Sequence, residues 1–534
     1  MTEKTKGNLP ARWVHATIAE LSLPTFTRNP QVSGQGSFAY IDIEAIDNLR
    51  QRIERPRRLQ NGAAPSRARN VVLPGDVIVS LVRPYLKNIA IVPSDLVDAV
   101  ASTAFFVCRP GAGVDSRYIF NYFRQGAFIS SIVTYGNSPP SAHDDEFAQL
   151  VLPLPPAKEQ ERIADALDEL LSDLDAGAAA LGRVRDKLKL YRAAVLKAAV
   201  EGALTAEWRK QQHSHTEPAS ELLGRILAER RRRWEEERLR EFKEKGREPS
   251  KNWKAKYKEP VAPDTADLPP LPEGWCWASM DQLAWSAGYG TSEKCRESNT
   301  GLAVLRIPNI VSGSVALDDL KFAPPSYVER DEDLVSIGDF LIVRTNGSRK
   351  LIGRGAVVRS APAIPLSFAS YLIRLRLVPD PSLLAWLALI WDSSFIRRWI
   401  ETRAATSAGQ YNISLGVLET LAVPLPPVVE QRTIAESADG QLSVIDHLES
   451  DIDAKLANAQ ALRQSVLRHA FCGKLVSQDS NDEPASELLK RIAVEREQRA
   501  REAAAAKRLN GQRPRRAAKA RGKAARAKST KKEN

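Results

Sequence analysis

The motif PLPPAKEQERIA at residues 153–164 returns as PLPPVVEQRTIA at residues 424–435. Proline is tolerated in the first turn of a helix but not in its interior, so each Pro-Pro pair predicts the start of a helix. Glu159 and Glu430 then lie in the first turn, where the positive end of the helix dipole stabilises a carboxylate. The duplicated motif therefore predicts two long helices that begin in the same way.

Apolar residues follow both starts in alternating steps of four and three, which is the spacing of a coiled-coil seam. The side chains predicted to pair the helices are Leu167, Leu170, Leu174, Leu181, Leu188, Ile445, Leu448, Ile452, Leu462 and Val466. Each stretch spans roughly 50 residues, which is about 75 Å of straight helix. Because the intervening globular segment can return the chain to the far end, we expect the helices to pair in antiparallel orientation. The alternative is that each helix packs only on its own domain.

The repeat extends over nearly the whole chain, and repetition of this extent indicates a duplicated module. Trp13 aligns with Trp275 near the start of each half. The paired segments are LPARWVHATIAEL with LPEGWCWASMDQL, LPGDVIVSLVR with SIGDFLIVRTN, RAAVLKAAVEGAL with RQSVLRHAFCGKL, and EPASELLGRI with EPASELLKRI. Each half thus has the order globular segment, proline-rich stop and long helix.

Short runs in the globular segments, such as NVVLPGDVIVSLV and SYLIRLRLV, are rich in β-branched and aromatic residues, which is typical of strands. The sequence predicts an α+β fold in which two similar β-rich domains are separated by a pair of long antiparallel coiled-coil helices, with a pseudo-two-fold internal repeat. The predicted boundaries are 1–152 (first β-rich domain), 153–212 (first spacer helix), 213–262 (charged helical extension and linker), 263–423 (second β-rich domain), 424–476 (second spacer helix), 477–506 (C-terminal helical segment) and 507–534 (basic tail).

The net charge of +12 is concentrated at the C-terminus. Residues 507–534 contain twelve Lys or Arg and one Glu, a net of +11, which leaves +1 for the rest of the chain. We expect this tail to be disordered, and either to hold phosphates or to act as a solubilising tail. No apolar run approaches the roughly 18 residues of a membrane span and no hydrophobic signal segment opens the chain, which predicts a cytoplasmic protein without a membrane partner.

No arrangement of residues suggests catalysis by this chain. NSPPS at residues 137–141 lacks the aromatic residue after Pro140 that a base methyltransferase stacks on a flipped base. GSRKLIGRG at residues 347–355 lacks the order of a phosphate-binding loop, and His213 and His215 have no third metal ligand in sight. Four widely spaced cysteines suggest neither a disulfide framework nor a zinc ribbon. We therefore predict a chain with no catalytic residues, no metal and no cofactor of its own.

The mixed-charge run after the first EPASELL is predicted to be a solvated helical extension and linker. The alternative is that the arginines at residues 230–233 contact phosphates.

Two β-rich domains held apart by paired helices suit a long, regular ligand that is read at two separated places, and duplex DNA with a two-part site fits that description. The chain resembles the specificity subunit of type I restriction-modification systems over essentially residues 8–500. The resemblance rests on LPGDVIVSLVRPYLKNIAIV, LVLPLPPAKEQERIA, LPEGWCWASMDQL, GQYNISLGVLETLAVPLPPVVEQRTIA and the two EPASELL segments. The first half departs from the pattern, since YGNSPPSAHDDEFAQL stands where the second half has SAGQYNISLGVLETL.

The resemblance implies two target-recognition domains, each reading one half of a split asymmetric sequence in double-stranded DNA. It implies that the helices set the number of unread base pairs between the halves and dock two modification subunits, which carry the S-adenosylmethionine site. It also implies assembly with restriction subunits that use ATP and magnesium. The expected function is non-catalytic DNA recognition in host defence and DNA methylation. The rival from another class is a coiled-coil scaffold whose β domains bind proteins.

Arginine and amide side chains in loops can read base edges, while Lys and Ser hold phosphates. On that basis the residues expected to contact DNA are Arg83, Tyr85, Lys87, Arg344, Asn346, Ser348, Arg349, Lys350, Gln410 and Tyr411. The alternative for Arg83 and Arg344, which end aligned strands, is a partly structural role.

Overall fold

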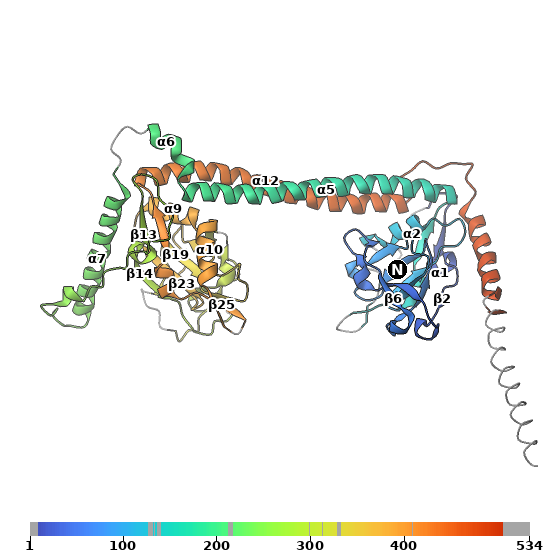
Figure 1. Cartoon of the computed structure of the whole chain (residues 1–534), viewed down its shortest axis with the longest axis horizontal. Coiled ribbons are helices and arrows are strands. Elements are labelled where there is room, and N and C mark those ends of the chain that lie inside the picture. Colours follow the sequence, from blue (N-terminus) through green and yellow to red (C-terminus); the bar gives the residue numbers. More distant parts are fainter. Residues whose placement is uncertain are drawn as a thin grey trace, which may run out of the picture. The chain divides into compact units, whose positions relative to one another are not determined.

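Figure 1 shows the computed structural model of the chain, which describes residues 9–126, 132, 134–135, 140–211, 217–297, 300–311, 313–327, 333–407, 409–502 and 504–505. The chain divides into two compact units, formed by residues 1–181 with 453–534 and by residues 182–452. Both contain helices and sheets, so the mixed α+β class is confirmed. The predicted basic tail at residues 507–534, His213, His215 and most of the NSPPS motif lie outside the described residues.

The globular part of the first unit is built on a strand pair and two sheets. β1 (Val14–Thr17) pairs antiparallel with β12 (Val151–Leu154), so the chain enters and leaves this part side by side. One sheet has the order β2-β7-β10-β3-β6, and the other has the order β11-β8-β9. The strand bounds are β2 (Phe26–Thr27), β3 (Ser37–Ile41), β6 (Arg57–Gln60), β7 (Ala68–Val72), β8 (Val77–Ser80), β9 (Ile89–Ile91), β10 (Ala99–Ser102) and β11 (Phe105–Cys108), with a small pair β4 (Ile46–Asp47) and β5 (Arg52–Ile53). The helices are α1 (Ile18–Leu21), α2 (Ser116–Phe123) and α4 (Asp144–Ala148).

The second unit repeats the same entry and exit. β13 (Cys276–Ser279) pairs antiparallel with β26 (Ala422–Leu425). The sheets have the orders β14-β23-β19-β21-β17-β16, β18-β15-β22 and β20-β25-β24. The strand bounds are β14 (Ala284–Tyr289), β15 (Ala303–Leu305), β16 (Ile310–Val311), β17 (Gly313–Val315), β18 (Lys321–Phe322), β19 (Asp339–Val343), β20 (Thr345–Asn346), β21 (Gly355–Val357), β22 (Leu366–Phe368), β23 (Leu372–Leu377), β24 (Ala405–Ser407) and β25 (Gln410–Asn412). The helices are α6 (Ala206–Gln211), α7 (Ala219–Glu244), α8 (Met280–Leu283), α9 (Pro381–Ile390), α10 (Ser394–Arg403) and α11 (Leu415–Glu419).

The first strand of each unit ends in the same local signal. Thr17 caps α1 in a capping box with Glu20, and Ser279 caps α8 in a capping box with Gln282. A hydroxyl at the N-cap and a Glu or Gln three residues later satisfy two helix-terminal N–H groups reciprocally, which fixes a sharp strand-to-helix turn. The aligned sequences WVHATIAEL and WCWASMDQL therefore fold alike.

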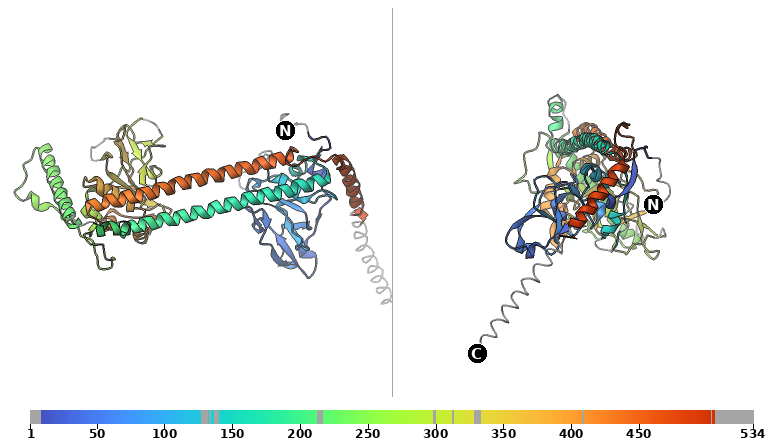
Figure 2. Two further views of the ribbon diagram at one scale, coloured as in Figure 1. Left: turned by 90° about the horizontal axis from the view of Figure 1, so that it is seen from above. Right: turned by 90° about the vertical axis from the view of Figure 1, so that its right-hand side faces the viewer.

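The two long helices begin where the Pro-Pro pairs predict them. They are α5 (Ala157–Val200) and α12 (Val428–Phe471), each of 44 residues. In the first unit the start of α5 lies against the end of α12, with an ion pair between Asp175 and Arg463. In the second unit the end of α5 lies against the start of α12, where Tyr191 donates a hydrogen bond to Gln441 over 2.9 Å. Within each unit the two segments run in opposite directions, side by side (Figure 2).

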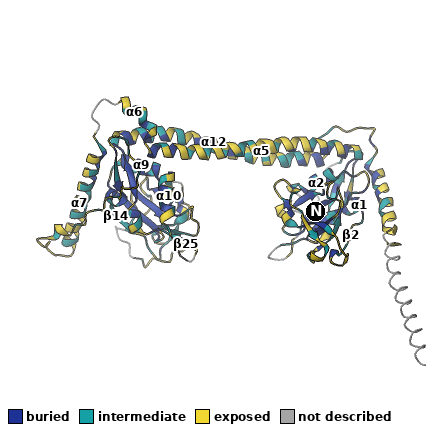
Figure 3. Cartoon of the chain, viewed as in Figure 1, coloured by how far each residue is buried: buried dark blue, intermediate teal, exposed yellow. Residues whose placement is uncertain are grey.

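The predicted seam residues differ in burial along these segments (Figure 3). Leu167, Ile445 and Ile452 are buried, whereas Leu170, Leu448 and Leu462 are exposed. Leu174, Leu181, Leu188 and Val466 are partly buried. In the first unit Leu171 is buried in place of Leu170.

A cavity of about 500 Å³ opens between the paired segments of the first unit, and its lining includes Gly177 and Ala178. The predicted residues that line it are Leu170, Leu174, Leu181, Leu462 and Val466. The two helices do bring these side chains to one place. Because glycine and alanine contribute almost no side chain there, the space between the helices is not filled, and Leu170 and Leu462 stay exposed.

The C-terminal segment belongs to the core of the first unit. Ala485, Leu488 and Ile492, from the second EPASELL segment, are buried in the same hydrophobic cluster as Trp13 and Ile163. In the second unit the first EPASELL segment does the equivalent, since Ala219, Leu222 and Ile226 are buried in the cluster that contains Trp275 and Ile434. The segment after each long helix therefore packs on the globular part that precedes the other long helix.

Candidate functional site

The structure brings two separately predicted stretches of the second unit together. β20 pairs antiparallel with β25, which sets Asn346 opposite Tyr411 and Thr345 opposite Asn412. β24 extends this small sheet on the other side of β25, where Ser407 faces Gln410. The amide and aromatic side chains of Asn346, Gln410 and Tyr411 thus come from one sheet, although 63 residues lie between β20 and β25.

Arg344 enters this sheet from the end of β19. Its guanidinium lies 4.3 Å from the centre of the Tyr289 ring and donates to the carbonyl oxygen of Ser370 over 3.4 Å. Its backbone N–H donates to Tyr371 and its carbonyl accepts from Ile413. Arg344 is therefore half-buried and held by the fold.

The turn after β20 is held by α10 and presents basic side chains. The amide of Asn346 accepts from the Ser348 backbone over 2.8 Å, and Arg349 donates to the carbonyl oxygen of Glu401 over 2.8 Å. Ser348, Arg349 and Lys350 are exposed, as is Arg403 at the end of α10. The predicted residues here form one accessible, positively charged rim beside the β20–β25 sheet.

The three residues predicted in the first unit lie in one tight turn but face differently. Arg83 and Lys87 flank a single 3-10 turn (Pro84–Leu86) in left-handed conformations, with φ of 49° and 54°. Arg83 is exposed and so is Tyr85. Lys87 instead donates to the carbonyl oxygen of Arg124 at the end of α2 over 3.4 Å. Burial, with Arg124 and Arg463 nearby, lowers the pKa of Lys87.

Sequence reasoning missed an arginine-rich ribbon in the first unit. Residues 50–69 contain seven arginines and one glutamate, and they include the edge strand β6 and the β4–β5 turn. Arg55, Arg58 and Arg67 are exposed, whereas Arg57 pairs with Asp42. Counting the net charge in windows of about 20 residues would have found this ribbon, because residues 50–69 contain only one acidic residue to balance seven arginines.

A buried carboxylate at the start of each long helix joins three segments of its unit. Trp13 donates to Glu159 over 3.1 Å and Gln478 donates to the other oxygen over 2.6 Å. In the second unit Trp275 donates to Glu430 over 2.9 Å and Thr205 donates over 2.6 Å. Both glutamates are only 1% exposed. We call these contacts the Trp–Glu latches.

Glu159→Leu is expected to destabilise the first unit by about 2–4 kcal/mol, because the buried donors of Trp13 and Gln478 lose their acceptor. Glu159→Gln should cost less, since burial raises the pKa of Glu159 and a neutral side chain suits the site. A raised pKa means that the folded state binds the proton more tightly than the unfolded state does. The stability gained from protonating Glu159 is therefore fully present below its ordinary pKa of 4.5, and it is lost as the pH rises through the raised pKa of the folded state.

Urea unfolding between pH 4 and 8 tests this expectation. As the pH rises, the free energy of unfolding of the wild type should fall relative to that of Glu159→Gln. A difference that stays constant across the range would contradict it.

Each unit also contains a buried carboxylate–guanidinium pair at aligned positions. Asp76 accepts from Arg109 over 2.9 and 2.7 Å, with both side chains buried. Asp339 accepts from Arg376 over 3.0 Å, and Arg374 lies 3.9 Å away. Both aspartates follow a glycine with positive φ, Gly75 and Gly338. The duplicated Gly-Asp pair therefore marks a structural ion pair that anchors β8 in one unit and β19 in the other.

Among the described residues, no cluster of three or more His, Cys, Asp or Glu side chains has the arrangement of a metal site. No helix in the described ranges is both long enough and apolar enough to cross a membrane.

Comparison with known proteins agrees with this architecture. Residues 25–179 match the family model of the type I restriction modification DNA specificity domain. The chain is 26% identical over 400 residues to the type I restriction enzyme EcoKI specificity subunit of Escherichia coli K12, covering 73% of this chain and 74% of that protein. It is 23% identical over 515 residues to the StySPI specificity subunit of Salmonella potsdam, covering 92% of this chain and 97% of the relative. Over these lengths the chain is similar to specificity subunits of type I restriction enzymes.

The fold of this chain is also found among solved structures. A chain from work on complex assembly and conformational transition of the type I R-M system has a TM-score of 0.63, with 23% identity over 88% of this chain and 100% of that chain. In this chain, the β20–β25 rim and the turn at Arg83 and Tyr85 are the candidate recognition surfaces that sequence and structure select together.

Proposed function

We propose that this specificity subunit recognises a two-part site in double-stranded DNA, with one half contacted by the β-rich part of each unit. The observation that carries the proposal is the duplicated framework: the strand pairs β1–β12 and β13–β26 and the two Trp–Glu latches present two similar scaffolds. The loops on the scaffolds differ, because the second unit has the β20–β25–β24 sheet and the first has the Arg83 turn. Similar frames with different loops suit two different half-sites.

In the second unit we assign phosphate contact to Ser348, Arg349 and Lys350 and base contact to Asn346, Gln410 and Tyr411. Amide side chains can pair with adenine edges bidentately, and exposed cations bind the backbone without reading sequence. Arg344 supports the sheet through its stack on Tyr289 and completes the positive rim. In the first unit Arg83 and Tyr85 are the corresponding candidates, with Lys87 beside them at the base of the turn.

We further propose that α5 and α12 act along their whole length as one antiparallel pair that fixes the number of unread base pairs between the half-sites. The accessible leucines of the first unit's cavity offer the pair an apolar face for the two modification subunits. Those subunits would supply the S-adenosylmethionine site, and restriction subunits would supply the use of ATP and magnesium. The specificity subunit contributes recognition and no catalytic group.

Methylome sequencing of the host with and without the gene tests the proposal. The expected result is a methylated motif with two defined blocks and a fixed gap, and the assembled complex should protect both blocks in a footprint. A scaffold that binds proteins through its β domains would protect no sequence and would leave the methylome unchanged.

Arg349→Ala with Lys350→Ala is expected to weaken DNA binding by the assembled complex. Because each phosphate contact contributes about 0.9 to the slope of log K against log salt, the slope should become shallower by up to about 2. Titrations at several salt concentrations measure it. The control is Lys210→Ala with Arg225→Ala, which removes equal charge from exposed ion pairs of the same unit. An unchanged slope in the first variant would exclude these two residues from the interface.

A further inference from the structure

The charged stretch after the first EPASELL segment is helical and largely exposed, as predicted, and the chain then folds back on this helix. α7 runs from Ala219 to Glu244, and the following residues return along it through a 3-10 turn (Trp253–Lys256). The ring of Trp234 on α7 stacks on Trp253 with centroids 5.9 Å apart and meets Tyr257 edge-on at 5.2 Å. Phe242 meets Trp253 at 6.2 Å. These four rings form a small core of their own, and we call residues 219–258 the α7 hairpin.

The α7 hairpin is fixed to the second unit at its base. Leu222 and Ile226 are buried in the core of that unit. Arg230 donates to Asp281, to the carbonyl oxygen of Ala284 and to the Tyr257 hydroxyl, each over 2.9 Å. The predicted alternative for residues 230–233, direct phosphate contact, is therefore not favoured for Arg230, because its donors are already used.

Charge is distributed unevenly along the hairpin. At the base and middle, Arg232 and Arg238 form ion pairs with glutamates of α7, and Arg225 pairs with Glu217 just before the helix. The tip, residues 243–252, has four Lys or Arg and two Glu, a net of +2. Its exposed cations are Lys243, Lys245, Arg247 and Lys251. Among the described residues only Lys245 of these has an ion pair, with Glu241.

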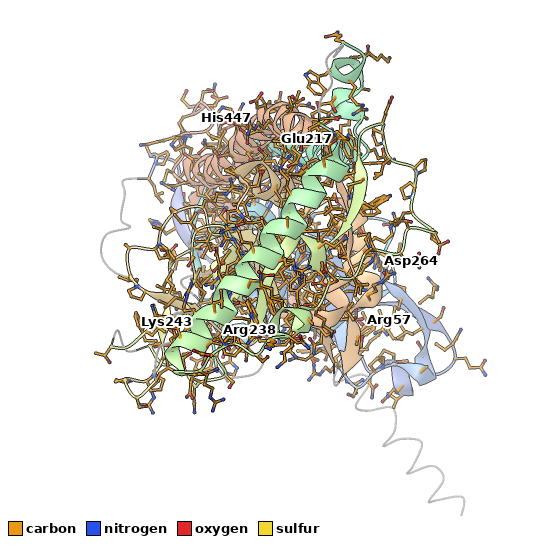
Figure 4. The ribbon with its side chains drawn as sticks, turned by 90° about the vertical axis from the view of Figure 1, so that its left-hand side faces the viewer. Arg57, Glu217, Arg238, Lys243, Asp264 and His447 are labelled. Carbon is orange, nitrogen blue, oxygen red and sulfur yellow. The ribbon has the colours of Figure 1, made fainter. Side chains whose placement is uncertain are left out.

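The tip lies at the end of the second unit that carries the candidate DNA surface. Figure 1 shows α7 running away from α12, so that its last turn lies at the same end of the unit as β25. In Figure 4 Glu217, before α7, is labelled toward the same end of the view as α12, whereas Arg238 and Lys243 are labelled at the opposite end. A duplex held by the β20–β25 rim would therefore pass on the side of the unit to which the tip projects.

We infer that the tip of the α7 hairpin binds phosphates of the duplex outside the half-site contacted by the second unit. The inference rests on the proposed function. Lysines are compact charges on flexible stems, which suit backbone phosphates and carry no sequence information. The aromatic core and the Arg230 contacts hold the tip in place, so little ordering is needed when DNA binds. Unpaired, exposed cations also release counterions from DNA, which favours association at low salt.

The test compares duplex length and hairpin charge in the assembled complex. One duplex carries the methylated motif and extends about 15 base pairs, or roughly 50 Å, beyond the second unit's half-site, and the other ends about two base pairs beyond it. Shortening is expected to weaken binding by wild type about tenfold at 0.1 M salt. The variant Lys243→Ala/Arg247→Ala/Lys251→Ala should bind the long duplex about as weakly as wild type binds the short one, and shortening should then have no further effect.

The control variant is Arg225→Ala/Arg232→Ala/Arg238→Ala, which removes the same charge from paired positions of the same hairpin and should keep the full effect of shortening. Equal effects of shortening on the wild type and the tip variant overturn the inference. Loss of restriction subunits by the tip variant in mass photometry, with DNA binding intact, would identify the tip as a protein-docking surface and also overturn it. Failure of the proposed function is distinguishable, since the wild type would then not prefer the motif over a scrambled duplex.

Discussion

Asp76→Leu is expected to destabilise the first unit by about 3–5 kcal/mol, because it leaves the buried guanidinium of Arg109 without its carboxylate. Domains are stable by only about 5–15 kcal/mol, so the variant should unfold at a much lower urea concentration. Urea unfolding followed by circular dichroism measures the change. In the methylome, the block read by the first unit should be lost.

The double variant Asp76→Leu/Arg109→Met is the control. Replacing both partners of a buried pair by apolar residues removes the unpaired charge and is often neutral or stabilising. It should therefore recover most of the stability that Asp76→Leu loses. A double variant as unstable as the single one would show that the hydrogen bonds, rather than the uncompensated charge, hold β8 in place.

Ile445→Asp is expected to cost about 3–5 kcal/mol in the second unit, since it places a carboxylate at a position that is 1% exposed between the paired helix segments. The matched control is Val444→Asp, one residue earlier on the same helix and 59% exposed, which should change stability by less than about 0.5 kcal/mol. Thermal unfolding of the two variants gives the comparison directly. Similar melting temperatures would show that α12 does not need its apolar stripe.

The starts of the long helices could be predicted because the signal is local. A Pro-Pro pair cannot lie inside a helix, and α5 and α12 begin directly after the two pairs, at Ala157 and Val428. The alignment of Trp13 with Trp275 also predicted that the two tryptophans have equivalent positions in their units. Their contact with Glu159 and Glu430 could not be predicted, since 146 and 155 sequence positions separate the partners.

The register of the seam could be predicted only in part. A heptad pattern states which residues face a partner, but not how closely the two backbones approach. At Gly177 and Ala178 the missing side-chain volume leaves a cavity, and Leu170 and Leu462 remain exposed although they line it. Residue types on both helices decide the burial there, and a single sequence does not show which residues lie opposite each other.

The candidate DNA surface could be predicted where basic residues lie in a turn directly after a strand, as Arg349 and Lys350 do. The prediction for Lys87 was less informative, because the left-handed backbone at Arg83 and Lys87 turns that side chain toward α2. Neither residue is a glycine or asparagine, so nothing in the sequence announces the conformation. Conversely, the run at residues 229–259 has the composition of a solvated linker, and its four aromatic residues close into a core only once the chain turns back.

The latch on Glu159 determines how truncation of the chain after α12 affects the first unit. Gln478 and the buried residues Ala485, Leu488 and Ile492 follow α12 in the sequence, yet they complete the unit that contains Trp13 and the start of α5. A nascent chain released before them would leave Trp13 and the start of α5 uncovered. An early stop codon after Phe471 should therefore abolish methylation of the block read by the amino-terminal half while every residue of the carboxy-terminal reader is still present.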